Sequence, residues 1–300
     1  MYFPVAELNL NPAWPILIGL GVSVFSSPTG ISGGFLILPI CVNFLGFSSV
    51  AVSPTNFIFN IVAMPAGLWR LAREKRLLWG LGGILMIGSL PGIIAGMILR
   101  NTWLKEAGDF KIFMALVLTA LALNLARSLK GDKAGARAER IFQARQRECR
   151  LPEYIETTYK QRRLIFNFCE EDFSVSIPSV IGISLIVGLA GGIYGIGGAA
   201  IIAPILISHF HLPIYIINGA SLLAGWAAAV FGLVSYILIW PLVSGQPPVM
   251  PDFKLGLLFG LGGMAGVYIG SALQRFLQPG PLKILMLFLI GGMAVQSFGF

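Results

Sequence analysis

Residues 29–39 read TGISGGFLILP, a glycine-rich break inside an otherwise apolar run. A second copy, YGIGGAAIIAP, occupies residues 194–204, which is 165 positions further along the chain (194 − 29 = 165). Both copies end in a proline, and no gap is needed to align them. This repeat indicates that the chain consists of two related halves, each of which opens on a glycine break.

The composition is typical of a membrane protein. Of 300 residues, 56% are hydrophobic and only 11% are charged, whereas soluble domains carry about 25% charged residues. A chain in lipid must satisfy its backbone polar groups internally, which leaves helices or a closed barrel. Barrel strands alternate apolar and polar residues, and the runs 84–99 and 282–293 do not alternate. The sequence therefore predicts an all-α integral membrane protein.

The formal net charge of +8 is distributed in a way that argues against nucleic-acid binding. Eleven of the 21 Lys and Arg residues lie between Arg127 and Arg163, and most others lie at helix ends. Basic residues placed in this way fix the orientation of a membrane protein. The lipid bilayer is therefore an expected partner; the oligomeric state is left open. The three cysteines show no metal-ligand spacing, and neither a metal nor a cofactor is predicted.

The lengths of the apolar stretches predict how the breaks are built. Each arm beside a break has about a dozen residues, or roughly 18 Å of helix, whereas a full span needs about 20 residues. We interpret each break as the tip of a re-entrant hairpin; one broken helix is the alternative. The first repeat is predicted at 1–126 (hairpin 14–45, spans 50–69, 79–99 and 112–125), a linker at 127–175, and the second repeat at 176–300 (hairpin 177–210, spans 215–241, 253–273 and 282–298).

The number of crossings predicts how the two repeats are oriented. A re-entrant hairpin returns to the side from which it entered, so each repeat crosses the membrane three times. Because three is odd, the second repeat is expected to be inverted relative to the first. Inverted repeats whose discontinuous helices meet at the midplane are the usual design of secondary transporters. The linker is assigned to the cytoplasm, since the basic loop 70–76 and the linker carry most of the positive charge. Residues 134–150 have helical composition.

Four matched glycines support the duplication and suggest close helix packing. They recur at one offset of 174 (256 − 82 = 174). Such small residues let helix backbones approach each other in a membrane, and they are given no role in ligand binding. The matched positions are Gly82, Gly88, Gly92 and Gly96 in the first half and Gly256, Gly262, Gly266 and Gly270 in the second.

The breaks have the chemistry of an anion site. A helix that starts at mid-depth leaves its first-turn N–H groups without intrahelical acceptors, at the positive end of the helix dipole. Glycine lets an anion approach this backbone closely and permits positive φ angles in the turn. No charged residue is expected deep in any span, which favours recognition by the backbone. The predicted substrate-binding residues are Thr29, Gly30, Ser32, Gly33 and Gly34 in the first break, Tyr194, Gly195, Gly197, Gly198 and Ala199 in the second, and Asn56, Asn218 and Ser221 on the following spans.

Other interpretations of these residues stay open. The serines and asparagines could simply join helices to one another, and the breaks would also suit a passive anion channel. Residues 30–33 match the Gly-x-Ser-Gly of intramembrane serine proteases, which need a basic partner. The two histidines, His209 and His211, are near the end of the second hairpin, and the second copy has Gly197 in place of Ser32. No catalytic residue is therefore assigned, and an enzyme is not predicted.

The duplicated Gly-Ile-x-Gly motif with its following proline, the polar residues on the next span and the hydrophilic linker resemble the TauE/SafE (TSUP) family of sulfite exporter-like permeases. The resemblance covers nearly the whole chain apart from the insert 127–172. It implies an inner-membrane transporter of sulfite, sulfonates such as sulfoacetate, or other small anions, with a proton as the coupling ion. The inverted repeats predict transport by alternating access, with one half of the protein rocking against the other. By motif match it places the substrate at 30–34 and 195–199. Ser32 interrupts the usual glycine run, which would make the site asymmetric.

Overall fold

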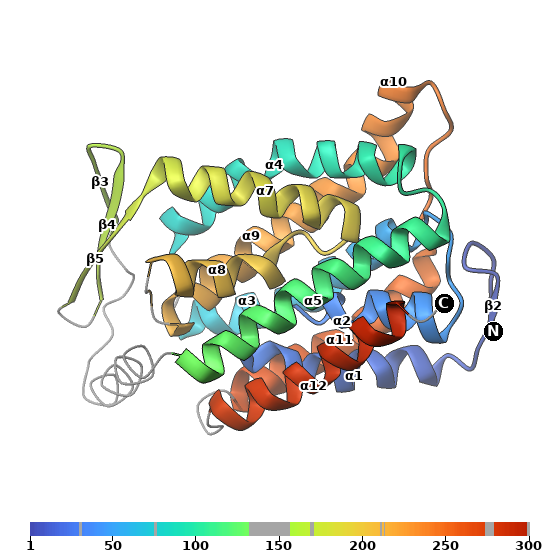
Figure 1. Ribbon diagram of the computed structural model, residues 1–300, viewed down its shortest axis with the longest axis horizontal. Coiled ribbons are helices and arrows are strands. Elements are labelled where there is room, and N and C mark those ends of the chain that lie inside the picture. The colour runs from blue at the N-terminus through green and yellow to red at the C-terminus, as the bar shows by residue number, and fades with distance from the viewer. Residues whose placement is uncertain are drawn as a thin grey trace.

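The computed structural model is mostly helical, with long helices lying side by side along one axis (Figure 1). It describes residues 1–300 except 30–31, 75–76, 132–156, 169–170, 211, 213, 274–278 and 299–300. The predicted helix at 134–150 and the predicted site residue Gly30 are therefore outside the described residues. Five described helices are long and apolar enough to cross a membrane, namely Trp79–Thr102, Ala107–Arg127, Ile177–Tyr194, Ile217–Ser244 and Phe253–Leu273.

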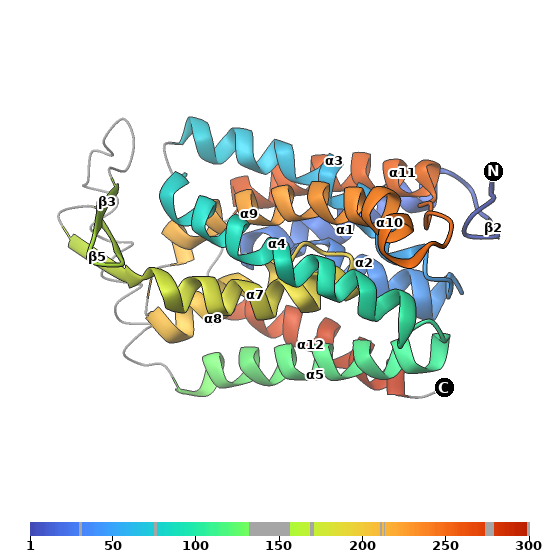
Figure 2. The same ribbon diagram turned by 90° about the horizontal axis from the view of Figure 1, so that it is seen from above.

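The first glycine break separates two short helical segments. The helix α1 (Ala13–Ser26) ends in a 3-10 turn, η1 (Ser27–Thr29), and α2 (Gly34–Pro39) continues as the π-helix η2 (Ile40–Phe44). The π-helix starts directly after Pro39, whose missing N–H interrupts regular α-helical bonding. The chain enters α1 and leaves η2 at the end of the bundle that carries the N-terminus (Figure 2).

The second break lies between α7 (Ile177–Tyr194) and α8 (Ala199–Phe210). The helix α7 begins beside a small sheet, and α8 returns toward that same end of the bundle (Figure 1). By length and composition, the 18 residues of α7 are enough to cross a membrane. The two arms of this segment are therefore unequal, whereas the sequence analysis treated both arms as short.

The remaining helices run along the length of the bundle. The helix α5 (Ala107–Gly131) extends past both ends of the predicted span 112–125. Asp109 is in its first turn, where the helix dipole favours a negative charge. The helix α3 is not among the membrane-crossing candidates, because its asparagines and arginines lower its hydropathy. The bounds are α3 (Val52–Arg73), α4 (Trp79–Thr102), α5 (Ala107–Gly131), α9 (Ile214–Val234) with the π-helix η3 (Ser235–Ile239), α10 (Trp240–Ser244), α11 (Phe253–Leu273) and α12 (Pro279–Phe298).

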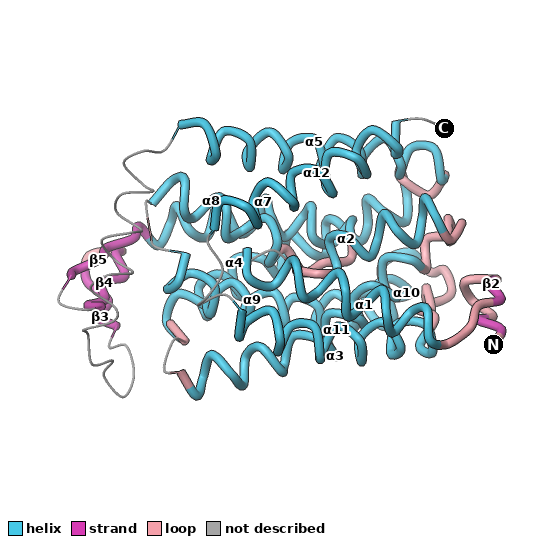
Figure 3. Tube along the Cα trace, turned by 90° about the horizontal axis from the view of Figure 1, so that it is seen from below, coloured by secondary structure: helices cyan, strands magenta, loops and turns pink. Residues whose placement is uncertain are grey.

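A three-stranded antiparallel sheet, which the sequence analysis did not predict, closes one end of the bundle (Figure 3). Its strands are β3 (Thr157–Lys160), β4 (Arg163–Phe168) and β5 (Glu171–Ser176), in that order. Successive side chains of a strand point to opposite faces, and Leu164 and Phe166 of β4 are both buried. They join one apolar cluster with Leu81 of α4 and Leu206 of α8. Part of the linker therefore packs on the helices.

The other end of the bundle is closed by the N-terminal hairpin of β1 (Tyr2–Phe3) and β2 (Leu8–Asn9). Asp252, which is only 2% exposed, fixes the turn of this hairpin. Its Oδ2 accepts hydrogen bonds from the backbone N–H groups of Val5 (3.2 Å) and Ala6 (3.3 Å). Its Oδ1 accepts one from the N–H of Leu255 (3.0 Å), so that the same carboxylate caps the start of α11.

The matched glycines make equivalent contacts in two helix pairs. The helix α4 packs along α7, where a Cβ on Gly92 would overlap the carbonyl oxygen of Leu185. The helix α11 packs along α1, where a Cβ on Gly266 would lie 2.5 Å from the carbonyl oxygen of Leu20. Gly266 follows Gly92 by 174 positions, and Leu185 follows Leu20 by 165. The predicted close packing is thus present, and each pair joins a helix from one half of the chain to a helix from the other.

We expect Gly92→Ala to lower the free energy of unfolding by about 1–3 kcal/mol, because the added methyl group must displace the backbone of α7. Gly83 lies on the same helix with no neighbouring atom within 4 Å of a Cβ position. Gly83→Ala should therefore leave stability unchanged or raise it by up to about 1 kcal/mol, since alanine restricts the unfolded chain. Unfolding of the purified variants in detergent, followed by circular dichroism, measures both effects. Equal stabilities would contradict the tight α4–α7 contact.

Candidate functional site

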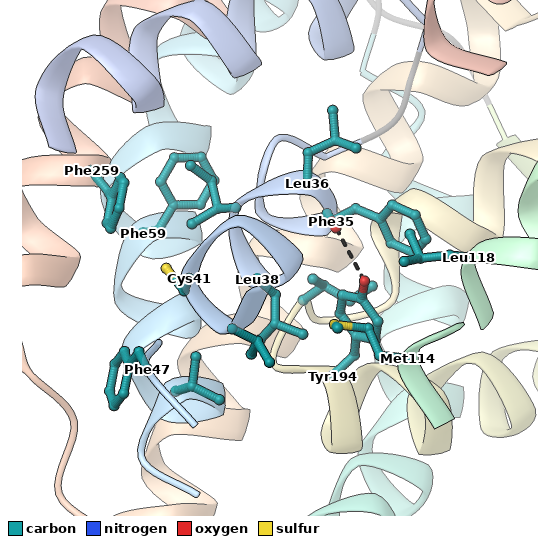
Figure 4. Close-up of a cluster of buried hydrophobic side chains, with 14 of the residues drawn as sticks. Phe35, Leu36, Leu38, Cys41, Phe47, Phe59, Met114, Leu118, Tyr194 and Phe259 are labelled. Carbon is teal, nitrogen blue, oxygen red and sulfur yellow. Dashed lines mark hydrogen bonds between the residues drawn. The ribbon is translucent and has the colours of Figure 1, made fainter. Parts of the chain in front are cut away.

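The two glycine breaks touch each other through Phe35 and Tyr194. Tyr194 is the last residue of α7, and Phe35 is in the first turn of α2. Their rings stack with centroids 5.1 Å apart and planes 9° apart. The Tyr194 hydroxyl also donates a hydrogen bond to the carbonyl oxygen of Phe35 (3.3 Å; Figure 4). Both side chains are fully buried, so segments 159 positions apart form one buried unit.

Apolar side chains enclose this contact. Met114 and Leu118 of α5 lie beside Tyr194, and Phe59 of α3 lies on the other side of α2 (Figure 4). All of them belong to one buried cluster, and none is more than 1% exposed. Polar groups of the breaks that face such a cluster need a partner from the protein or from a ligand, because burying them unpaired is costly.

The second break depends on glycine for both conformation and packing. Gly195, Gly197 and Gly198 have φ angles of 74°, 65° and 79°, in the left-handed region that favours glycine. A Cβ on Gly195 would overlap the carbonyl oxygen of Ser53 in α3, and one on Gly197 would lie 2.5 Å from that of Gly225 in α9. At these two predicted site residues, the backbone of the break is in direct contact with the backbones of α3 and α9.

The first break is built differently. Gly33 has a right-handed φ of −56°, so the expectation of positive φ angles is wrong at this position. Its small size is needed instead, because a Cβ would lie 2.8 Å from the Oγ of Ser23 and 3.0 Å from the ring of Phe59. At Gly34 a Cβ would lie 2.5 Å from the Nδ2 of Asn60. Thr29 ends the turn η1 before this break.

Unbonded N–H groups remain at the starts of α2 and α8. The Oγ of Ser32, the residue that interrupts the glycine run, accepts a hydrogen bond from the N–H of Gly34, the first residue of α2 (3.3 Å). In the part of the chain that the structure describes, no hydrogen bond is found for the N–H groups of Gly33, Gly197 or Gly198. Ala199 is the first residue of α8. Free donors at the positive ends of two helix dipoles suit an anion.

Asn60, which the sequence analysis did not select, connects the two breaks. Its Oδ1 accepts a hydrogen bond from the Ser32 hydroxyl (2.6 Å), and its Nδ2 donates to the carbonyl oxygens of Asn56 (3.0 Å) and Gly195 (3.5 Å). The Ser32 hydroxyl therefore donates to an amide oxygen, which is not a general base. Asn60 follows Asn56 by one helical turn and lies on the same face of α3. That spacing is the signal that could have identified it.

Two predicted residues each carry a buried polar atom without a partner. Asn56 donates from Nδ2 to the carbonyl oxygen of Gly34 (2.9 Å), while its Oδ1 has no partner among the described residues. The Oγ of Ser221, which is 165 positions further along the chain, has none there either. Leaving such an atom unsatisfied costs about 1–3 kcal/mol. Buried polar atoms without a protein partner, at matched positions of the two halves, are candidates to bind a ligand or water.

A cavity lies beside the first break, between α3, α9 and α11. Three predicted residues line it, namely Ser32, Gly33 and Asn218. Among the described residues, its lining has hydroxyl and amide groups on otherwise apolar walls, without Lys, Arg, Asp or Glu, and its space of about 20 Å³ is enough for a water molecule. The other predicted residues that the structure describes lie outside this lining. The full lining is Ser27, Ser32, Gly33, Phe59, Asn60, Ala63, Met64, Asn218, Leu222, Val267 and Ser271.

One sequence prediction about charge is wrong. Arg100 was placed in a connection between spans, but it lies inside α4 and is 0% exposed. A cation is therefore buried in the protein, and the backbone is not the only positive feature available to an anion.

These features define a polytopic helical membrane protein whose two helical hairpins meet at their glycine breaks, beside a small cavity with polar and apolar lining. A family model described as sulfite exporter TauE/SafE matches residues 16–297. The chain therefore belongs to the TauE/SafE sulfite exporter family, as its glycine motifs suggested. Comparisons with curated proteins and with solved structures give no match. Family and helices together identify a multi-pass membrane protein of the transporter class.

Proposed function

We propose that the protein is a secondary transporter of small anions, with sulfite and sulfonates such as sulfoacetate as its substrate class, and that a proton is the coupling ion. The observation that carries the proposal is the junction at Asn60, which bonds to Ser32 of one break and to Gly195 of the other beside a polar cavity. A substrate bound there would contact both breaks. We further place the protein in the inner membrane, with the linker 127–175 in the cytoplasm.

The chemistry of the junction supports an anionic substrate. Free N–H groups at Gly33, Gly197 and Gly198 face no protein acceptor among the described residues, and each precedes a helix whose dipole is positive at that end. The described residues that line the cavity include no carboxylate that would repel an anion. A neutral site of this kind can bind an oxyanion and also release it, which transport requires.

The arrangement of the helices supports two inverted repeats, 1–126 and 176–300. The segment α1–η2 enters and leaves at the N-terminal end of the bundle, while α7–α8 enters and leaves at the end with the sheet (Figure 2). The equivalent packing of α4 on α7 and of α11 on α1 agrees with a two-fold relation between the repeats. Inverted repeats with broken helices near the midplane are a common transporter design.

The helix contacts also suggest which parts move. The helix α11 packs on both α1 and α3, and α4 packs on both α7 and α9; these two groups meet where α3 contacts α9. Each group contains helices from both repeats. We propose that alternating access is a rocking of these two groups of helices about the α3–α9 contact, where Asn60 and Asn218 line the cavity.

Flux measurements in proteoliposomes test the proposal. We expect uptake of radiolabelled sulfite or sulfoacetate to saturate and to increase with an imposed pH gradient. Gly33→Leu should abolish uptake while the protein still inserts, because the side chain would collide with Ser23 and Phe59. Gly83→Leu on α4, where space is open, is the matched control and should keep its uptake. Flux at channel-like turnover that ignores the gradient would instead identify a passive channel.

A further inference from the structure

Arg100 is a buried cation whose charge no anionic group balances. It lies near the end of α4 and is 0% exposed. Among the described residues no carboxylate pairs with it; the ion pair found there joins Arg70 to Glu74 at the protein surface. Burying an unpaired charge costs far more than burying a neutral polar group. A functional role would explain why this charge is buried despite its cost.

Neutral groups hold the guanidinium in place. Its Nε donates to the Oγ of Ser53 (3.4 Å), and its two terminal nitrogens donate to the carbonyl oxygens of Leu104 and Ser49 (3.5 Å for Ser49). The ring of Phe110 covers one face, with its centroid 3.8 Å from the Cζ. These contacts orient the guanidinium and satisfy several of its five N–H donors, but they leave its full positive charge in place.

Ser53 and Tyr236 connect this charge to the second break. The Oγ of Ser53 donates to the carbonyl oxygen of Ile193 (2.9 Å), and the Tyr236 hydroxyl donates to that of Gly192 (3.1 Å). Arg100 is thus two hydrogen bonds from the last turn of α7. That turn is the negative end of the α7 dipole, and alone it would repel an anion from the break.

We infer that Arg100 sets the charge selectivity of the substrate site. Its positive charge offsets the negative C-terminal end of the α7 dipole. The electrostatic potential at the bound anion is then set mainly by the positive N-terminal end of α8. The inference rests on the proposed function of anion transport. In this arrangement Arg100 does not touch the substrate. It is a positioning and specificity-determining residue whose effect reaches the anion through the electrostatic field.

The size of the effect depends on the charge of the substrate. Over a separation of a few hydrogen bonds, at an effective dielectric constant of about 20, one positive charge should strengthen binding of a monoanion about tenfold. The interaction energy doubles for a dianion, so its affinity should change by about the square of that factor, or roughly 100-fold. A purely structural role for Arg100 would not distinguish the two charges.

Binding of two sulfonates to the purified protein tests the inference at neutral pH. Thermal-shift titrations would compare methanesulfonate, which carries one negative charge, with sulfoacetate, which carries two. We expect Arg100→Gln to weaken methanesulfonate binding about tenfold and sulfoacetate binding about 100-fold. We expect Arg100→Lys, which keeps the charge, to retain most of both affinities. Equal weakening for the two ligands in Arg100→Gln, or no weakening, overturns the inference.

A second variant keeps the test decisive if Arg100→Gln does not fold. Phe110→Glu would place a carboxylate beside the guanidinium and neutralise it without removing the arginine. Phe110→Glu should weaken the binding of sulfoacetate more than the binding of methanesulfonate; identical effects on the two affinities would overturn the inference. Ser53→Ala, which leaves the charge in place, is the control and should change the two affinities by the same factor. If the wild-type protein binds neither anion, the proposed function itself fails, and the inference with it.

Discussion

Gly195→Ala is expected to abolish anion uptake and to lower the free energy of unfolding by about 2–5 kcal/mol. Two physical costs combine at this position. The φ angle of 74° is unfavourable for any residue with a Cβ, and that Cβ would overlap the Ser53 carbonyl oxygen and lie 2.8 Å from the Ser53 Cα. The chain would have to move the second break away from α3, which also separates Gly195 from Asn60. Flux in proteoliposomes and unfolding in detergent measure the two losses.

Gly245→Ala is the matched control for this prediction. Gly245 has a similar φ of 68°, but no atom lies within 4 Å of its Cβ position. The substitution should cost only the left-handed strain, about 1–2 kcal/mol, and should leave uptake intact. If both variants lose the same stability and both keep their uptake, then the contact between Gly195 and Ser53 has no role in the site.

Asn60→Leu is expected to reduce uptake by at least about tenfold and to lower the free energy of unfolding by about 2–4 kcal/mol. Leucine has a similar volume but leaves the Ser32 hydroxyl and the Gly195 carbonyl oxygen buried without their present partner. Each such group costs about 1–3 kcal/mol. Among the described residues, the polar contact that then remains between the two breaks is the hydrogen bond from Tyr194 to Phe35. Uptake per inserted molecule is the measurement.

Asn101→Leu separates this effect from the general cost of losing a buried asparagine. Asn101 is 2% exposed, and among the described residues its Nδ2 donates to one partner, the carbonyl oxygen of Met97 in its own helix. Its replacement should leave uptake close to that of the wild-type protein. A loss of uptake in Asn101→Leu equal to that in Asn60→Leu would mean that Asn60 has no special place between the breaks.

Local patterns in the sequence were enough to predict much of this architecture. The repeated glycine motif identified the family, and the low charge content identified a helical membrane protein. The matched glycines on α4 and α11 predicted close packing, because a missing side chain is a local property with one common use in membranes. Nothing local indicated the sheet at 157–176, since its strands are short and depend on contacts with distant helices.

The sequence alone identified the two breaks at residues 29–34 and 194–199, because glycine content, proline positions and hydropathy are local properties that can be read directly from a segment. Only the tertiary structure decided that Tyr194 lies against Phe35, that Asn60 bonds to both breaks, and that Arg100 is buried behind the second one. These contacts join residues far apart in the chain, and their energies depend on which helices meet and on what water is excluded. A local pattern carries no information about such partners, so the duplicated motif predicted the place of the site but not its connections.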